Sequence, residues 1–195
     1  MVTEEADFKK IAHFFYETGN LKRVKRSGWW TINVKDPESV ADHSFRTAVI
    51  GYVLAQLEHA DAEHVTSICL FHDVPEARLN DLHKVGQRYI NFKEAETKVY
   101  QEQTDPLGET GKDIFSLHQE LNAQKTKEAL IARDADLLES LVQAREYGTI
   151  GYSDARDWIT NAKKHLVTES AKKLAKELEE TEPNGWWQGL KNIQR

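Results

Sequence analysis

Apolar side chains return every three or four residues along most of this chain, and no other feature constrains its fold as strongly. The pattern is clearest from 40 to 57 and from 130 to 142. This spacing puts the apolar residues on one face of an α-helix, whereas a half-buried strand would alternate apolar and polar positions. The sequence contains no stretch of such alternation, no internal repeat and no low-complexity segment. The pattern therefore predicts an all-α fold.

Helix caps and breakers predict where the helices begin and end. A long helix is expected to start near Glu38 or Ser39, and Asp61 is a suitable N-cap for the next one. Pro75 should break or kink that second helix, because proline has no backbone N–H to donate. Further helices are expected at about 87–103, 112–147 (as one or two helices), 154–162 and 168–180, and residues 21–37 look irregular.

The composition excludes several classes of protein. The chain has 195 residues, which suggests one domain with a sizeable core, and its formal net charge of -6 argues against general nucleic-acid binding. Its one cysteine, Cys69, cannot form an intramolecular disulfide and lies in an apolar run where it should be buried. The acidic N-terminus does not resemble a signal peptide, and no apolar run reaches the ~18 residues of a membrane span. We expect a cytoplasmic protein.

The stretch L-F-H-D-V-P-E-A-R-L-N-D (70–81) concentrates ionisable side chains at the end of an apolar helix. Asp and Glu are among the residues least often buried, so this placement needs an explanation. Neighbours such as His72 and Asp73 point ~100° apart on a helix, but both can reach one ion near the break at Pro75. Glu76 follows His72 by four residues and therefore projects from the same side if the helix persists.

Four residues are candidates for a single metal site: His43, His72, Asp73 and Asp136. Each lies in a predicted helix with apolar neighbours, where an unpaired carboxylate would be costly. Two imidazoles and two carboxylates are a suitable ligand set for a divalent transition metal. The alternative is that these residues bind no metal: a histidine on a helix is usually a tolerated polar residue, and Asp73 could simply end a helix. The spacing of the four residues leaves both interpretations open.

Three motifs resemble those of a known family. P-E-S-V-A-D-H-S-F-R (37–46), L-F-H-D-V-P-E (70–76) and A-D-L-L-E (135–139), in that order, resemble the HD superfamily of metal-dependent phosphohydrolases. The resemblance is closer to the single-domain 5'-deoxynucleotidase branch, in which a G-W element precedes the first motif. In that branch the H-D pair is followed by x-x-E and then G-D or N-D. The similarity runs from about residue 20 to 147.

The resemblance implies an all-α bundle forming one HD domain over 1–195, with the motifs in a core at about 20–147 and C-terminal helices at 153–192. It implies removal of phosphate from (deoxy)nucleoside 5'-monophosphates by attack of a metal-activated water, since a divalent ion lowers the pKa of bound water. Manganese, cobalt or magnesium is expected as the cofactor. The expected partners are a small nucleotide substrate and a second copy of the chain, with no nucleic-acid polymer and no membrane.

The resemblance also implies a role for each candidate residue. His43, His72, Asp73 and Asp136 would bind the metal, and Glu76 would be the catalytic carboxylate. Asp134 is a nearby competitor, but A-D-x-L-E and the downstream Q-A-R-E-Y set the register on Asp136. The residues expected to bind substrate or a second metal are Asp81, Arg46, Arg26 and Trp29, although a tryptophan in a helical protein is more often part of the core.

One position departs from the family pattern. In much of this branch an arginine precedes the N-V of the loop, and here that position is Ile32. If that arginine binds phosphate, Arg26 or Lys35 must replace it, or the substrate differs.

Two other functions compete with the leading one. The first is hydrolysis of a phosphodiester or pyrophosphate bond in another nucleotide, but family members with two-metal diesterase sites carry extra histidines and a G-Y-P element, where this chain has G-Y-S (151–153). The second is a non-catalytic nucleotide-binding scaffold, which would not need Glu76. The Trp186-Trp187 pair is expected to serve packing or a subunit contact.

Overall fold

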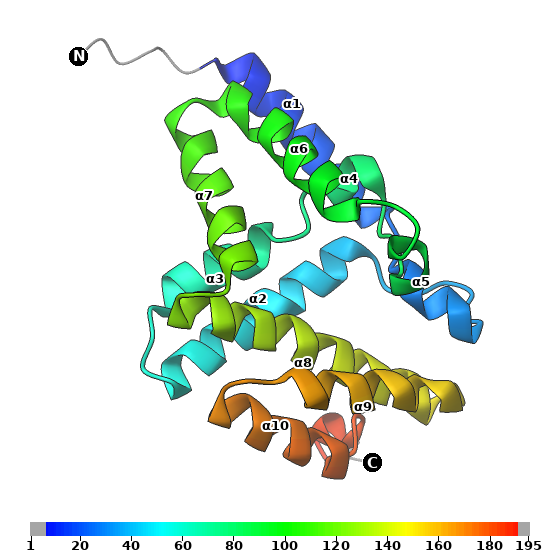
Figure 1. The fold of residues 1–195 in the computed structure, drawn as a ribbon. Helices are drawn as coiled ribbons and strands as arrows, with labels where there is room; N and C mark the ends of the chain where they lie inside the picture. The colour runs from blue at the N-terminus through cyan, green and yellow to red at the C-terminus, as the bar shows by residue number, and fades with distance from the viewer. Residues whose placement is uncertain (1–6, 191–195) are drawn as a thin grey trace, which may run out of the picture.

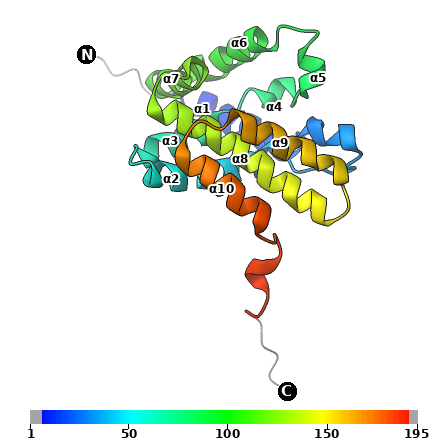
Figure 2. The same cartoon turned by 60° about the horizontal axis from the view of Figure 1, so that its bottom comes forward.

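The 23-residue helix α8 forms the centre of the fold. In the computed structural model, which describes residues 7–190, α2 and α3 pack on one side of α8, and α9 and α10 pack on the other (Figures 1 and 2). The α-helices of the described residues are α1 (Phe8–Thr18), α2 (Val40–Leu57), α3 (Ala62–Phe71), α4 (Glu76–Leu79), α5 (Lys84–Gln87), α6 (Phe92–Thr104), α7 (Glu109–Ala123), α8 (Lys127–Thr149), α9 (Arg156–His165) and α10 (Glu169–Glu180).

The all-α prediction is confirmed. Within residues 7–190 the structure has no strand, and one isolated β-bridge joins Lys25 to Ser39. No helix in that range is both long enough and apolar enough to cross a membrane. The predicted domain limits of 1–195, with C-terminal helices reaching 192, include residues 1–6 and 191–195, which lie outside the described residues.

Local chemistry explains most of the helix boundaries. Ser39 begins α2 through a capping box with Asp42, and the Asp61 side chain accepts a hydrogen bond at the start of α3, as its sequence predicts. The break at Pro75 is also confirmed, since α3 ends at Phe71 and the short α4 follows directly after the proline. A separate cap, Thr126, starts α8, so the segment 112–147 contains parts of two helices.

The predicted boundary that differs most from the structure is the start of the helix expected at 87–103, and the helix expected at 154–162 is observed at Arg156–His165. The helix expected from residue 87 begins five residues later, at Phe92, because the Asn91 side chain caps it by accepting from the backbone of Glu94. The residues before this cap form the four-residue α5 and a turn instead.

The main core lies where α2, α3 and α8 meet. Its most buried members are Leu54, Val65, Ile68, Ile131, Leu138 and Leu141. Gly51 lets α2 approach α3 closely, because an added Cβ there would lie 2.6 Å from the Cys69 sulfur and 3.2 Å from Val65. Cys69 is buried in this contact, as predicted. The close approach brings the end of α3 beside the first turns of α2.

A separate aromatic cluster fixes the irregular segment before α2. Trp29 lies in a 3₁₀ turn (Ser27–Ile32) and stacks on Trp158 at 4.8 Å, with Tyr147 edge-on at 5.0 Å. Edge-to-face and offset-stacked arrangements at these distances are the favoured aromatic geometries. Since Tyr147 belongs to α8 and Trp158 to α9, this cluster anchors the turn and the Arg26 that precedes it against the central helices.

Candidate metal centre

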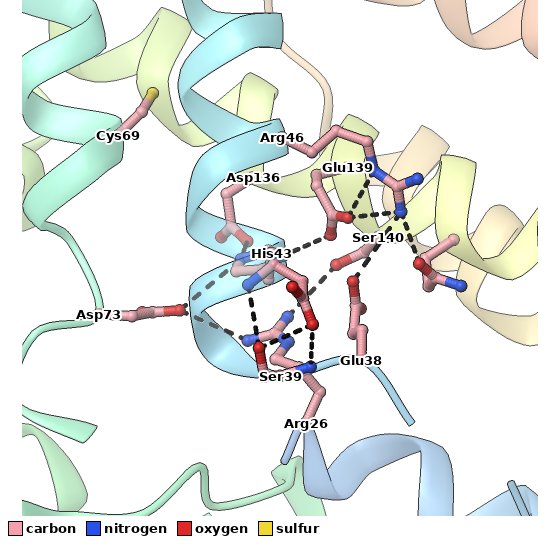
Figure 3. A network of polar contacts seen from close by, with 12 residues as sticks. Arg26, Glu38, Ser39, His43, Arg46, Cys69, Asp73, Asp136, Glu139 and Ser140 are labelled. Carbon is pink, nitrogen blue, oxygen red and sulfur yellow. Dashed lines mark hydrogen bonds and ion pairs between the residues drawn. The ribbon is translucent and has the colours of Figure 1, made fainter. Parts of the chain in front are cut away.

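Four predicted ligands converge from three separate parts of the chain. The Nε2 atom of His43, on α2, lies 3.3 Å from His72 Nε2, 3.3 Å from Asp136 Oδ1 and 3.6 Å from Asp73 Oδ2. His72 Nε2 is in turn 3.1 Å from Asp73 Oδ2. Figure 3 shows Asp73 and Asp136, the latter from α8, directed at His43 from different sides. Polar atoms of residues that are separated by 29 and by 63 positions in the sequence thus meet at one point.

Both imidazoles are oriented by the nitrogen that faces away from this point. His72, at the C-terminal end of α3, bonds through Nδ1 to the carbonyl oxygen of Cys69 at 2.6 Å. His43 bonds through Nδ1 to the carboxylate of Glu139. A metal-binding histidine nearly always donates its other ring N–H to a carbonyl or carboxylate, which fixes the ring and the tautomer. The geometry therefore leaves two Nε2 atoms for a shared ligand.

Two carboxylate oxygens near the cluster are buried without a hydrogen-bond partner among the described residues. They are Asp73 Oδ2 and Glu76 Oε2. A buried oxygen without a donor costs about 1–3 kcal/mol, and more when it carries charge. A divalent cation at the cluster would satisfy Asp73 Oδ2, and two nitrogen with two oxygen ligands match the preference of such ions. The residues present therefore fit a divalent metal.

The electrostatics of His43 reflect the crowding of charge at this point. Burial and the nearby Arg26 favour the neutral imidazole, but Glu139 and Asp136 outweigh them and raise the pKa of His43 to about 10. Burial likewise opposes the charged form of Asp136, yet its contacts with His43 and Arg133 keep its pKa well below the usual range. A bound cation would take the place of the His43 proton, since metal ligands must be deprotonated.

Negative charge exceeds positive charge on the side of Glu76. Burial first, and then Asp73 and Asp81, raise the pKa of Glu76 well above its usual value. Arg26 is the guanidinium that all of these carboxylates share, with Nη1 3.5 Å from Asp73 Oδ2 and 3.8 Å from Asp81 Oδ1. Several half-buried or buried carboxylates around one arginine are expensive without a further positive charge. This imbalance is a second reason why the site suits a cation.

Asp81 lies beside the cluster because the segment after α4 is tied to the turn before α2. Its carboxylate accepts from the backbone N–H of Ser27, and the Ser27 hydroxyl accepts from the backbone N–H of His83 at 3.0 Å. Asn80, at the end of α4, has a positive φ of 61°, which is uncommon for a residue other than glycine. Arg26 and Asp81 are therefore held on the same side of the site.

Asp134 and Asp136 point in different directions, because residues two positions apart on a helix project ~200° apart. Asp134 is fully buried and accepts from the backbone N–H groups of Val167 and Thr168 at 2.9 and 2.7 Å, and from the Thr168 hydroxyl at 2.7 Å. It thereby holds the start of α10. Asp136 faces His43 instead.

Two other predicted site residues bond elsewhere. Trp29 is only 2% exposed, and its indole N–H donates to Glu38 Oε1 at 3.0 Å, so the structure places it in the core. The guanidinium of Arg46, one turn after His43, is directed at α8 and not at the cluster. Being on the correct helix face did not decide where the side chain points, because a long arginine can reach several neighbours.

Two residues of the site were not among the sequence candidates. Glu139 is fully buried, ends the A-D-L-L-E motif and shares a face of α8 with Asp136, three residues earlier, and these are the sequence signals that could have identified it. Glu96, on α6, is half-buried near Asp73, and burial and that carboxylate raise the pKa of Glu96 to about 7. Its sequence surroundings contain no comparable signal.

A second group of possible ligands, formed by Glu38, His43 and Glu139, is less suited to a metal. Glu38 Oε1 already accepts from the Trp29 indole, and Glu139 Oε1 accepts from Arg46 at 2.8 and 2.9 Å. With these donors in place, the group forms a hydrogen-bonded support for His43.

The chain is similar to several known proteins. Residues 18–182 match the family model described as HD domain. The 5'-deoxynucleotidase HDDC2 of Dictyostelium discoideum is 34% identical over 143 residues, covering 69% of this chain and 75% of the relative. The 5'-deoxynucleotidase YfbR of Salmonella arizonae is 25% identical over 177 residues, covering 85% of this chain and 87% of the relative.

Solved structures agree with the fold. The protein PH0347 from Pyrococcus horikoshii superposes with a TM-score of 0.75 at 28% identity, covering 87% of this chain and 96% of that one. A protein from Magnetospirillum magnetotacticum, described as a predicted metal-dependent phosphohydrolase, superposes with a TM-score of 0.72 at 21% identity, covering 90% and 92% of the two chains. With its histidines and aspartates gathered at one point of an all-α bundle and its sequence matching over most of its length, the chain belongs to the HD-domain family.

Proposed function

We propose that this chain is a metal-dependent phosphohydrolase that removes phosphate from (deoxy)nucleoside 5'-monophosphates. The observation that carries the proposal is the convergence of His43, His72, Asp73 and Asp136, with the buried carboxylate of Glu76 beside them. Membership of the HD-domain family supports the reaction class, and the relatives named 5'-deoxynucleotidase support the substrate class.

The four converging residues would hold one divalent cation, which we propose to be manganese, cobalt or magnesium. When bound there, the ion supplies Lewis acidity toward a phosphoryl oxygen and acidifies water. Glu76 is positioned to accept a proton at Oε2, the oxygen that has no other partner among residues 7–190. Burial and the neighbouring carboxylates raise the pKa of Glu76, which makes its carboxylate a stronger proton acceptor than a free one.

Arg26 is the residue that we propose to bind the substrate phosphate. Its half-buried guanidinium lies 3.5 Å from Asp73 and offers the local positive charge that a chain of net charge -6 needs to attract an anion. Ile32, which stands where the family resemblance leads us to expect an arginine, packs against the Trp29 cluster. Asp81, held by Ser27, would contact the sugar or a second ion.

A phosphate-release screen tests the function. The metal-stripped protein is supplied with manganese, cobalt or magnesium and then with each deoxy- and ribonucleoside monophosphate. We expect release from at least one monophosphate, and no release after chelation or from a His72→Ala variant. No release from any monophosphate by metal-loaded protein would overturn the proposal. Release from a phosphodiester or pyrophosphate substrate alone would support that alternative, and nucleotide binding without any hydrolysis would support a scaffold.

We also propose that two copies of the chain associate through α2. Five large apolar side chains along its outer face are about half or more exposed, namely Phe45, Val49, Tyr52, Val53 and Leu57. No charged residue occurs from 47 to 57, which suits a self-complementary contact between two copies of one helix. Trp186 and Trp187 are also exposed, but they lie at the other end of the chain, in a 3₁₀ turn after α10.

The mass in solution tests this association. Light scattering should give twice the mass of one chain, and Val53→Glu with Leu57→Glu should return it to a monomer, because two carboxylates would then face each other across the contact. A monomeric wild-type protein at micromolar concentration would contradict the proposal. The cytoplasmic location and the single domain over 1–195 stay predictions.

A further inference from the structure

The hydrogen bonds of the Arg46 guanidinium go to one helix, α8. Its Nε and Nη2 atoms donate to Glu139 Oε1 at 2.9 and 2.8 Å, and Nη2 also donates to Gln143 Oε1 at 2.6 Å. Its Nη1 atom donates to both oxygens of Glu146 at 2.9 Å. An arginine has five N–H donors. Nε and Nη2 use their three donors in these contacts, and Nη1 faces the single carboxylate of Glu146, so all three guanidinium nitrogens are engaged by α8 in this arrangement.

Glu139 connects this arginine to the metal cluster. It is fully buried, with Oε1 bound to Arg46 and Oε2 bound to His43 Nδ1 (Figure 3). An ionised carboxylate can only accept hydrogen bonds, so the hydrogen must reside on Nδ1 of the imidazole. The lone pair of a metal-binding imidazole is then on Nε2, which faces His72 and Asp136.

The partners of Arg46 come from successive turns of the helix that also carries a predicted ligand. Asp136, Glu139, Gln143 and Glu146 follow one another at intervals of three, four and three residues, and so lie on one face of α8. The arginine therefore fastens α2 to α8 at the level where His43 meets Asp136. The same contact supplies the positive charge that a fully buried Glu139 requires.

We propose that Glu139 and Arg46 are positioning residues of the metal centre: Glu139 sets the tautomer and ring orientation of His43, and Arg46 holds Glu139 in place. Arg46 then has no part in binding phosphate. The inference rests on the proposed metal site, but it does not depend on which substrate is hydrolysed. Outer-shell partners of this kind typically change metal affinity ~10–100-fold when they are altered.

The experiment measures metal affinity and steady-state kinetics on the same variants of the full chain. Glu139→Gln keeps the size of the side chain but can present its NH₂ group to Nδ1, and Arg46→Lys keeps the charge but loses the planar fork. We expect both variants to bind manganese ~10–100-fold more weakly, measured by calorimetry without substrate. At saturating metal their KM for the nucleotide should change by less than ~3-fold, since neither residue contacts substrate.

Two matched controls separate this role from others. Arg26→Lys should show the opposite pattern, with a raised KM and no weakening of manganese binding, because we place Arg26 at the phosphate. Glu146→Gln removes an exposed partner of Arg46 that does not touch Glu139, and should leave manganese affinity within ~3-fold of wild type. Thermal unfolding of each metal-free variant establishes that it is folded.

Either of two results would overturn the inference. One is unchanged manganese affinity in folded Glu139→Gln. The other is an Arg46→Lys variant with unchanged manganese affinity and a KM raised tenfold or more, which would assign Arg46 to phosphate. Failure of the proposed function would look different. The wild type would bind manganese, the variants would bind it more weakly as expected, and yet the wild type would release no phosphate from any monophosphate.

Discussion

Glu76→Gln should lower the turnover number by about 10²–10⁴-fold while leaving manganese affinity close to that of the wild type. The side chain is 6% exposed, and its Oε2 atom has no partner among the described residues, so glutamine fits the same space. What the substitution removes is an oxygen able to accept a proton. Single-turnover phosphate release at saturating metal, together with calorimetric titration of manganese, measures both parts of this prediction.

Glu96→Gln is the matched control for this substitution. Glu96 is a second carboxylate near Asp73 with a raised pKa, but it comes from α6, which carries none of the four predicted ligands. We expect Glu96→Gln to keep turnover within about 3-fold of wild type. If Glu96→Gln lost turnover and Glu76→Gln kept it, the proton acceptor would be Glu96 and the mechanism proposed for Glu76 would be wrong.

Alanine substitutions at Asp136 and Asp134 should have opposite effects on metal binding and stability. Asp136→Ala removes a predicted ligand, so its manganese affinity should fall by more than the ~100-fold that is typical of an outer-shell partner. Asp134→Ala should retain the metal but lower the free energy of unfolding by about 2–4 kcal/mol. The substitution leaves the backbone N–H groups of Val167 and Thr168, at the start of α10, without their acceptor.

Thermal unfolding with and without manganese distinguishes the two variants in one measurement. A ligand that binds the native state alone raises the midpoint of unfolding. Asp134→Ala should unfold at a lower temperature than wild type and still respond to manganese, whereas Asp136→Ala should show no response. A manganese response that is lost with Asp134→Ala and kept with Asp136→Ala would show that the register of the ligands on α8 is shifted.

The helices could be predicted because their causes are local. Ser39, Asp61 and Pro75 act on backbone groups within a few residues, so the start of α2, the start of α3 and the break after α3 follow from the sequence nearby. The start of α6 was predicted five residues early because Asn91 caps the helix there, and a charged segment without a strong apolar stripe gave no indication of it. Local signals therefore predict a helix boundary wherever the capping residue or the proline is identified in the sequence.

The candidate ligands could be proposed because their residue types are unusual on apolar helix faces, and the family motifs identified the four positions. The structure brings His43, His72, Asp73 and Asp136 to one point, which no spacing in the sequence specifies. Their meeting depends on packing, in particular on the close approach of α2 and α3 that Gly51 permits.

The sequence by itself determined an all-α fold, most of its helix boundaries and the residue types able to bind a metal, because these follow from periodicity, capping and side-chain chemistry. Only the tertiary structure decided what the long side chains contact. Arg46 shares a helix face with His43, yet its three guanidinium nitrogens bond to α8, and Trp29 lies in the core. The contacts of a side chain that can reach several neighbours depend on the charged and hydrogen-bonding groups that other helices place near it. Those groups come together only in the folded chain.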